Sequence, residues 1–245
     1  MVSLATLATP LRLVAVSRPY SINSQQSLGQ LATKLGQSSL GRTTVVLRVD
    51  SVDECIKYIQ YIGSLCDNTT LDLRVNCPEV LSYILEGREL PNELERAVGG
   101  FHFKELALLS GGGVCEHAFE YFKERQWEVS FSSHSVENYD SCYSRLVSSG
   151  LRPDFFLVGT MYETNSHPEK GANVEGIELL RSVRRLHDER RRGAEIVGIG
   201  GIDVEGGKIR DVLNAGGDGV AVIGALFGAD DSGEVLERLW EKMEQ

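Results

Sequence analysis

The sequence contains few cysteines, and none of them is placed for a zinc site or a disulfide framework. Five cysteines are scattered over 245 residues without a CxxC pair, the spacing that zinc sites and redox motifs use. Free cysteines of this kind are typical of a reducing compartment, where they fill cores as small apolar side chains. We therefore expect reduced thiols and a cytoplasmic protein.

Excess positive charge and long apolar runs are also missing. The formal net charge is −10, which argues against general nucleic-acid binding because the phosphate backbone favours basic surfaces. The apolar run Leu11–Val16 is too short to span a membrane and follows no basic region of a signal peptide. We expect neither a nucleic-acid nor a membrane partner, whereas a small anionic ligand stays compatible because local charge decides a binding site.

What the sequence does contain is a regular alternation of short β-branched runs with helical segments. Examples of the latter are Val52–Leu65, Val114–Arg125 and Glu175–Arg192, with Gly193 as a C-cap. Eight such units without a linker predict one α/β domain over residues 1–245, a (β/α)8 TIM barrel; an open doubly wound sheet is the alternative. The expected strands are Leu11–Arg18, Thr43–Asp50, Thr69–Asn76, Gly99–Glu105, Trp127–Ser135, Asp154–Tyr162, Glu195–Ile202 and Asp218–Ala225.

Four consecutive strands, the second to the fifth, have one apolar and one polar face. Since side chains alternate along a strand, the apolar faces should pack under the helices and the polar faces should point into the barrel. There they form either a structural ion network of Arg48 and Arg74 with Asp50 and Asp72, or a cationic pocket for an anionic substrate; the two are compatible. The inward polar residues are Arg48, Asp50, Asp72, Arg74, Asn76, Lys104 and His134.

Glycines follow the last two expected strands, in Val197–Ile202 and Asp218–Gly224. Glycines at these strand ends let backbone N–H groups approach a phosphate, where many barrels bind one. We expect a phosphate site at Gly200, Gly201, Ile223 and Gly224; the alternative is that the glycines serve tight turns only.

A second polar segment, Val158–Pro168, ends the sixth expected strand. Its hydroxyl and imidazole groups suit phosphate oxygens, although loops are often polar without a ligand. The predicted donors are Thr160, Thr164, Ser166 and His167, with Lys170 nearby.

Over nearly the whole chain the sequence resembles the thiamine phosphate synthase/TenI family. Gly159–His167 is similar to the family's GxxxxTxxK, Ile199–Ile202 to IGGI and Ala215–Val222 to GADGVAV. Ser132–Glu137 is similar to SxHSxEE. Two shorter likenesses are Gly100–Glu105 to GVHL and Val75–Asn76 to VN, the latter making Asn76 a binding candidate.

The chain departs from the synthase pattern at the metal and pyrophosphate positions. In the synthase branch, two aspartates hold Mg²⁺ while a pyrimidine pyrophosphate is joined to a thiazole phosphate; here these positions are Cys77 and Ala107. Neither side chain is a hard oxygen ligand. The family's Arg is Pro78, and its strand-six Lys is His167. The resemblance thus implies a retained thiazole-phosphate half and no metal site, with Mg²⁺ needed only if the protein is a synthase.

This pattern resembles the TenI branch, whose activity is a metal-independent tautomerisation of a carboxythiazole phosphate. His134 is the catalytic candidate because imidazole titrates near neutral pH. Arg48, Arg74 or Lys104 would meet the substrate carboxylate. His102 is a second candidate for the acid/base, although a structural role is favoured for it. The alternatives are a divergent synthase or a non-catalytic sensor of a phosphorylated ligand, and self-association stays open.

Overall fold

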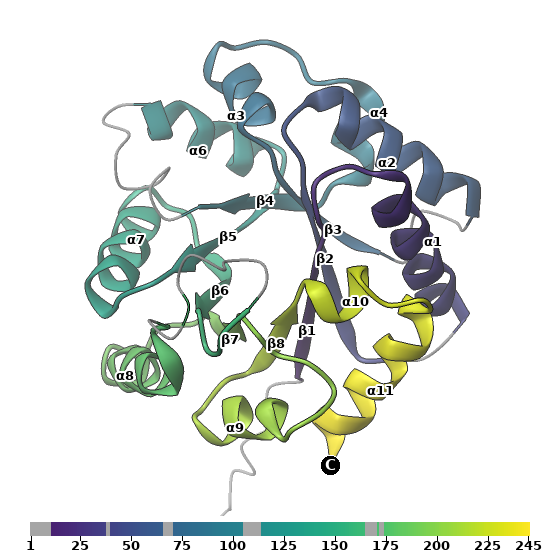
Figure 1. Ribbon diagram of the computed structural model, residues 1–245. Helices are drawn as coiled ribbons and strands as arrows, with labels where there is room; N and C mark the ends of the chain where they lie inside the picture. Colours follow the sequence, from purple (N-terminus) through teal and green to yellow (C-terminus); the bar gives the residue numbers. More distant parts are fainter. Residues whose placement is uncertain (1–10, 38–39, 66–70, 105–113, 165–170, 172–173) are drawn as a thin grey trace, which may run out of the picture.

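The chain folds into a closed barrel of eight parallel strands with helices around it (Figure 1). The computed structural model describes residues 11–37, 40–65, 71–104, 114–164, 171 and 174–245. The strands follow one another in chain order, and β8 pairs with β1. The predicted TIM barrel is therefore confirmed, and the open doubly wound sheet is not formed.

All eight expected strands form, although most of them end earlier than expected. The last residues of most expected strands belong to the loops that leave the barrel and are not part of the sheet. The strands are β1 (Arg12–Val16), β2 (Arg42–Arg48), β3 (Asp72–Asn76), β4 (Gly100–Phe103), β5 (Glu128–Ser133), β6 (Pro153–Gly159), β7 (Glu195–Ile199) and β8 (Gly219–Val222).

The longest expected helix is shorter than its sequence indicated. It ends at Glu189, and Arg191 rather than Gly193 takes the left-handed conformation, with a φ of 49°. No described helix has both the length and the apolar content needed to cross a membrane. The helices are α1 (Ile22–Gln37), α2 (Val52–Leu65), α3 (Pro78–Leu85), α4 (Asn92–Ala97), α6 (Val114–Glu124), α7 (Val136–Ser148), α8 (Gly176–Glu189), α9 (Lys208–Asn214), α10 (Gly224–Phe227) and α11 (Ser232–Glu244).

The barrel has an outer core beneath the helices and a smaller inner core. Val45 and Leu47 belong to the outer core, whereas Val46 between them points inside. The same alternation in β3, β4 and β5 confirms the predicted apolar outward faces. The middle of the barrel is mostly apolar, with His102 as a buried polar side chain, and the inward charged groups lie toward its two ends. The inner core contains Val14, Val16, Val46, Phe155, Leu157, Val197 and Ala221.

Buried arginines and carboxylates close the N-terminal end of the barrel. Arg12 is fully buried and donates to Thr44 at 2.6 Å and to Asp154 at 3.0 Å, and it also pairs with Glu195. Arg42 reaches Glu195 at 2.8 Å. Burial raises the pKa of the Glu195 carboxyl, against the opposing effect of Arg12. Because the carboxylates share several guanidinium groups, this end is a structural ion network.

Of the ion network expected from the sequence, only the Arg74–Asp72 half lies there. Arg74 contacts Asp72 at 3.0 Å, Asp154 at 3.1 Å and the Gly99 carbonyl oxygen at 2.7 Å, and also pairs with Glu128. Arg48 is the last residue of β2, at the opposite end of the barrel. The inward polar residues expected near the barrel axis are divided between its two ends, because a strand's periodicity gives the face of a side chain but not its height along the axis.

Candidate functional site

The candidate site lies where the eight strands end. Since all strands are parallel, Asn76 in β3, His134 after β5 and Thr160 after β6 are at one end of the barrel, as are Gly200 after β7 and Gly224 after β8. Thr164 is half-buried at the edge of the described chain. Ser166, His167, Lys170 and Ala107 lie outside the described residues.

His134 is held between the ends of β5 and β6. Its Nδ1 contacts the Gly159 carbonyl oxygen and lies 3.7 Å from Oε1 of Glu175. The backbone around it is fixed, because Ser133 donates to the Ser135 carbonyl oxygen at 3.0 Å and Ser135 caps α7. The imidazole is 41% exposed, so its surroundings permit contact with a ligand.

Glu175, which sequence reasoning missed, joins His134 to the end of β6. Its Oε2 accepts a hydrogen bond from the Thr160 backbone N–H at 2.6 Å, and the next residue, Gly176, donates to the Thr160 carbonyl oxygen at 3.0 Å. A glutamate before the first residue of a helix is common, since negative charge there is favoured. The sequence therefore carried no specific signal for this contact.

His102 is a structural residue of the barrel interior. Its Nδ1 lies 2.9 Å from the Ser130 hydroxyl and its Nε2 lies 3.0 Å from the Ser132 hydroxyl. Burial, followed by the nearby charges of Arg74 and Lys104, lowers the pKa of His102 to about 3. A neutral ring with both nitrogens bonded supports the site from below, and it leaves His134 as the acid/base candidate.

Gly200 and Gly201 allow the loop after β6 to pack against the end of β7. Both have left-handed backbones, with φ of 102° and 66°, and a Cβ on Gly200 would lie 2.5 Å from Cγ2 of Thr160. Thr160 itself is buried. The structure thus gives these glycines a packing role of their own, and their contact with phosphate stays a prediction.

At the end of β8, an arginine that sequence reasoning missed lies beside Gly224. A Cβ built on Gly224 would be 3.6 Å from Nη2 of Arg18, and one on Gly228 would be 3.1 Å from the same atom. Arg18 is exposed and follows β1. Because β1 and β8 are paired neighbours, it adds positive charge next to Ile223 and Gly224, where phosphate was predicted.

The three cations predicted to meet a substrate carboxylate are separated. The Arg74 guanidinium is engaged with the carboxylates of the N-terminal end, so its assignment to a ligand is corrected: it is a residue of the ion network. Arg48 ends β2 and is half-buried, and Lys104 follows β4 and is exposed. Asn76 donates to the His102 carbonyl oxygen at 2.7 Å and thereby ties β3 to β4.

The described residues do not fit a magnesium site. Cys77 is 1% exposed, and a hydrogen bond with the Cys55 thiol lowers its pKa, against the effect of burial. The neighbouring carboxylate of Glu79 accepts a hydrogen bond from the Val52 N–H at 2.7 Å. Mg²⁺ requires oxygen ligands, and within the described chain no three metal-ligating side chains come together.

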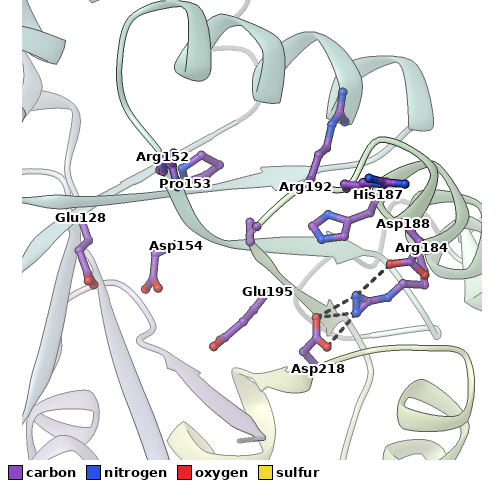
Figure 2. Close-up of a pocket in the computed structure, with 13 residues that line it drawn as sticks. Glu128, Arg152, Pro153, Asp154, Arg184, His187, Asp188, Arg192, Glu195 and Asp218 are labelled. Carbon is purple, nitrogen blue, oxygen red and sulfur yellow. Dashed lines mark hydrogen bonds and ion pairs between the residues drawn. The ribbon is translucent and has the colours of Figure 1, made fainter. Parts of the chain in front are cut away.

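A hollow of about 670 Å³ lies at the opposite, N-terminal end of the barrel (Figure 2). Glu128, Asp154 and Glu195 belong to the N-terminal ends of β5 to β7. Its charges are mostly paired: Arg184, for example, binds Asp218 at 2.8 Å. Because barrel enzymes carry out their chemistry at the other end, we interpret this hollow as the surface of the ion network.

Comparison with known proteins finds a family that the second half of the barrel resembles. The model of the family described as thiamine monophosphate synthase matches residues 118–226. Over these residues the match confirms the resemblance to the thiamine phosphate synthase/TenI family. The matched range includes His134, Glu175 and the glycines after β7 and β8, whereas Arg48 and Cys77 lie outside it.

Curated relatives are named thiamine-phosphate synthase, and they match this chain over part of their length. The thiamine-phosphate synthase of Halorhodospira halophila is 36% identical over 111 residues, 42% of this chain and 48% of that protein. That of Bacillus licheniformis is 35% identical over 91 residues, 37% of this chain and 38% of that protein. The alignments thus span less than half of these relatives.

Solved structures support the fold over the whole chain. Thiamine phosphate pyrophosphorylase from Pyrococcus furiosus has a TM-score of 0.64 at 20% identity and covers 96% of both chains. A 3-hexulose-6-phosphate synthase has a TM-score of 0.60 at 13% identity, covering 95% of this chain and 99% of that one. At these identities the likeness establishes a shared barrel and nothing about the reaction.

Proposed function

We propose that this protein is an enzyme of thiamine metabolism that binds a thiazole phosphate at the C-terminal end of its barrel. The observation that carries the proposal is the family match over 118–226, which includes the strand ends where the phosphate is expected. Arg18 beside Gly224 and the glycines after β7 supply the positive charge and the close backbone approach that a phosphate needs.

For the reaction itself, the residues of the site support a metal-independent proton transfer. An isomerase of this kind needs one group that takes a proton and returns it. His134 is exposed to the site and contacts acceptors at Nδ1, whereas the buried thiol of Cys77 is unsuited to Mg²⁺. The ligand would be a carboxythiazole phosphate, with Arg48 or Lys104 near its carboxylate.

The names of the relatives favour a second reaction, the joining of a pyrimidine pyrophosphate to a thiazole phosphate. Both curated relatives described above are named thiamine-phosphate synthase. If this chain performs that transfer, its pyrophosphate half must use residues other than those of the family pattern, since Cys77 and Pro78 replace an aspartate and an arginine.

Calorimetric titration separates these reactions. Thiazole phosphate and carboxythiazole phosphate are each added with and without Mg²⁺ and pyrimidine pyrophosphate. Tight binding of carboxythiazole phosphate without metal, followed by turnover that His134→Asn abolishes, supports the isomerase. Product formation only with Mg²⁺ and both substrates supports the synthase. Failure of both thiazoles to bind contradicts the proposed ligand, and binding without either turnover indicates a sensor.

A further inference from the structure

The contacts of Nδ1 in the His134 ring favour a proton on this nitrogen. Nδ1 contacts the Gly159 carbonyl oxygen and lies 3.7 Å from the Glu175 carboxylate. Carbonyl and carboxylate oxygens accept hydrogen bonds and cannot donate them. Both therefore favour a proton on Nδ1, which makes Nε2 the nitrogen that accepts a proton in the neutral ring.

We propose that Glu175 is a positioning residue that helps the Gly159 carbonyl oxygen to hold His134 in this tautomer. A buried carboxylate acts in this way on the histidine of a hydrolase triad without reacting itself. The tautomer rests on the acceptors around Nδ1, whereas its kinetic consequence rests on the proposed proton transfer.

Glu175 is itself held in place, so that it can orient its neighbour. Its carboxylate is 22% exposed, and its Oε2 accepts the Thr160 N–H at 2.6 Å. The hydrogen bond from the Gly176 N–H to the Thr160 carbonyl oxygen, at 3.0 Å, fixes the backbone on the other side. With Oε2 engaged, Oε1 is the oxygen directed toward His134.

This geometry makes the Glu175→Gln variant informative. The Thr160 N–H can only donate, so the amide oxygen of the new side chain should take the place of Oε2. Its NH₂ group would then face His134 and donate toward Nδ1. A donor in place of an acceptor works against the proton on Nδ1, which the Gly159 carbonyl oxygen alone would then favour. The variant keeps the size of the side chain and an acceptor for the Thr160 N–H.

Long-range ¹H–¹⁵N spectra of protein labelled with ¹⁵N-histidine measure the tautomer directly. They are recorded at about pH 8, where an ordinary histidine is neutral, and the His134 signals are assigned by their loss in His134→Asn. In the unaltered protein we expect the Nδ1–H form to dominate, and in Glu175→Gln we expect the Nε2–H form to increase several-fold. The matched control is Glu178→Gln, the same change on α8 at a side chain that is 79% exposed, which should leave the spectrum unchanged.

The outcomes distinguish the inference from the proposed function. A dominant Nε2–H tautomer in the unaltered protein, or identical His134 signals in Glu175→Gln, overturns the inference without any assay of activity. If the unaltered protein turns over carboxythiazole phosphate, Glu175→Gln should lower kcat by at least about 10-fold and change KM by less than about twofold; an unchanged kcat overturns the kinetic role. If the expected tautomers are found but carboxythiazole phosphate is not turned over, the positioning of His134 is supported and the proposed isomerase activity is contradicted.

Discussion

At the residue scale, Arg12 has the largest predicted effect on stability. It is fully buried and contacts the carboxylates of Asp154 and Glu195. Removing one partner of a buried ion network leaves uncompensated charge, so Arg12→Met should lower the free energy of unfolding by about 3–5 kcal/mol. The control Arg238→Met breaks an exposed pair with Glu205 and should cost less than about 1 kcal/mol. Urea unfolding measures both, and equal losses would contradict a structural network.

His102 should make the protein less stable at acid pH. Its pKa is about 3 when folded, against an ordinary value of 6.5, so between these values the unfolded chain binds a proton that the folded chain does not. Stability is therefore lost as the pH falls below 6.5, by about 2 kcal/mol at pH 5. His187, whose pKa burial also lowers, adds to this loss.

The check is the pH dependence of urea unfolding in His102→Asn. Whatever its stability at pH 7, this variant should lose less on going to pH 5 than the unaltered protein does. His117→Asn, at an exposed position of α6, should keep the original dependence. The same pH slope in His102→Asn and in the unaltered protein would show that His102 is not held neutral.

At the element scale, the turn after β7 depends on the absence of a side chain at Gly200. Gly206 offers a matched comparison, since its φ is 73° and a Cβ there would have nothing within 4 Å. An alanine at either position costs about 1 kcal/mol for its left-handed backbone. At Gly200 the added Cβ also overlaps Thr160, which should cost about 1–3 kcal/mol more.

Urea unfolding of Gly200→Ala and Gly206→Ala gives this difference directly. Calorimetry with thiazole phosphate then shows whether the same turn serves the ligand: weaker binding is expected in Gly200→Ala and unchanged binding in Gly206→Ala. Equal stability of the two variants would mean that the loop after β6 yields to the new methyl group.

Helices and strands could be predicted from the sequence more fully than the contacts of single side chains. Period-two alternation in β2 indicated that Val45 and Leu47 face the helices, and the structure agrees. The same alternation could not show that the Arg74 side chain extends toward carboxylates at the N-terminal end. Nor could the alternation predict that Glu175 lies near His134, because that contact depends on how the chain after β6 returns to the barrel.

At the scale of the whole molecule, glycines allow neighbouring strands to approach at three seams of the barrel. Gly100 in β4 lies against the Glu128 carbonyl oxygen of β5, and Gly159 in β6 against that of Ile199 in β7. Gly219 in β8 lies against the Arg12 carbonyl oxygen of β1. The eightfold alternation of strands and helices indicated a barrel, but it did not show where neighbouring strands approach closely. A glycine within a strand gives the same sequence signal whether or not the backbone of the next strand lies against it.

The seam between β8 and β1 closes the barrel, so Gly219→Ala should weaken the whole fold. The added Cβ would overlap backbone atoms of Arg12, which cannot move aside because β1 is paired with β2 on its other edge. We expect a loss of about 3 kcal/mol or more and faster hydrogen exchange of the Arg12 amide, which donates to the Asp218 carbonyl oxygen at 3.0 Å. Gly206→Ala should leave that amide protected. If Gly219→Ala matched this control in both unfolding and exchange, the closing seam would have room for a side chain, and the close approach of β8 to β1 would not limit stability.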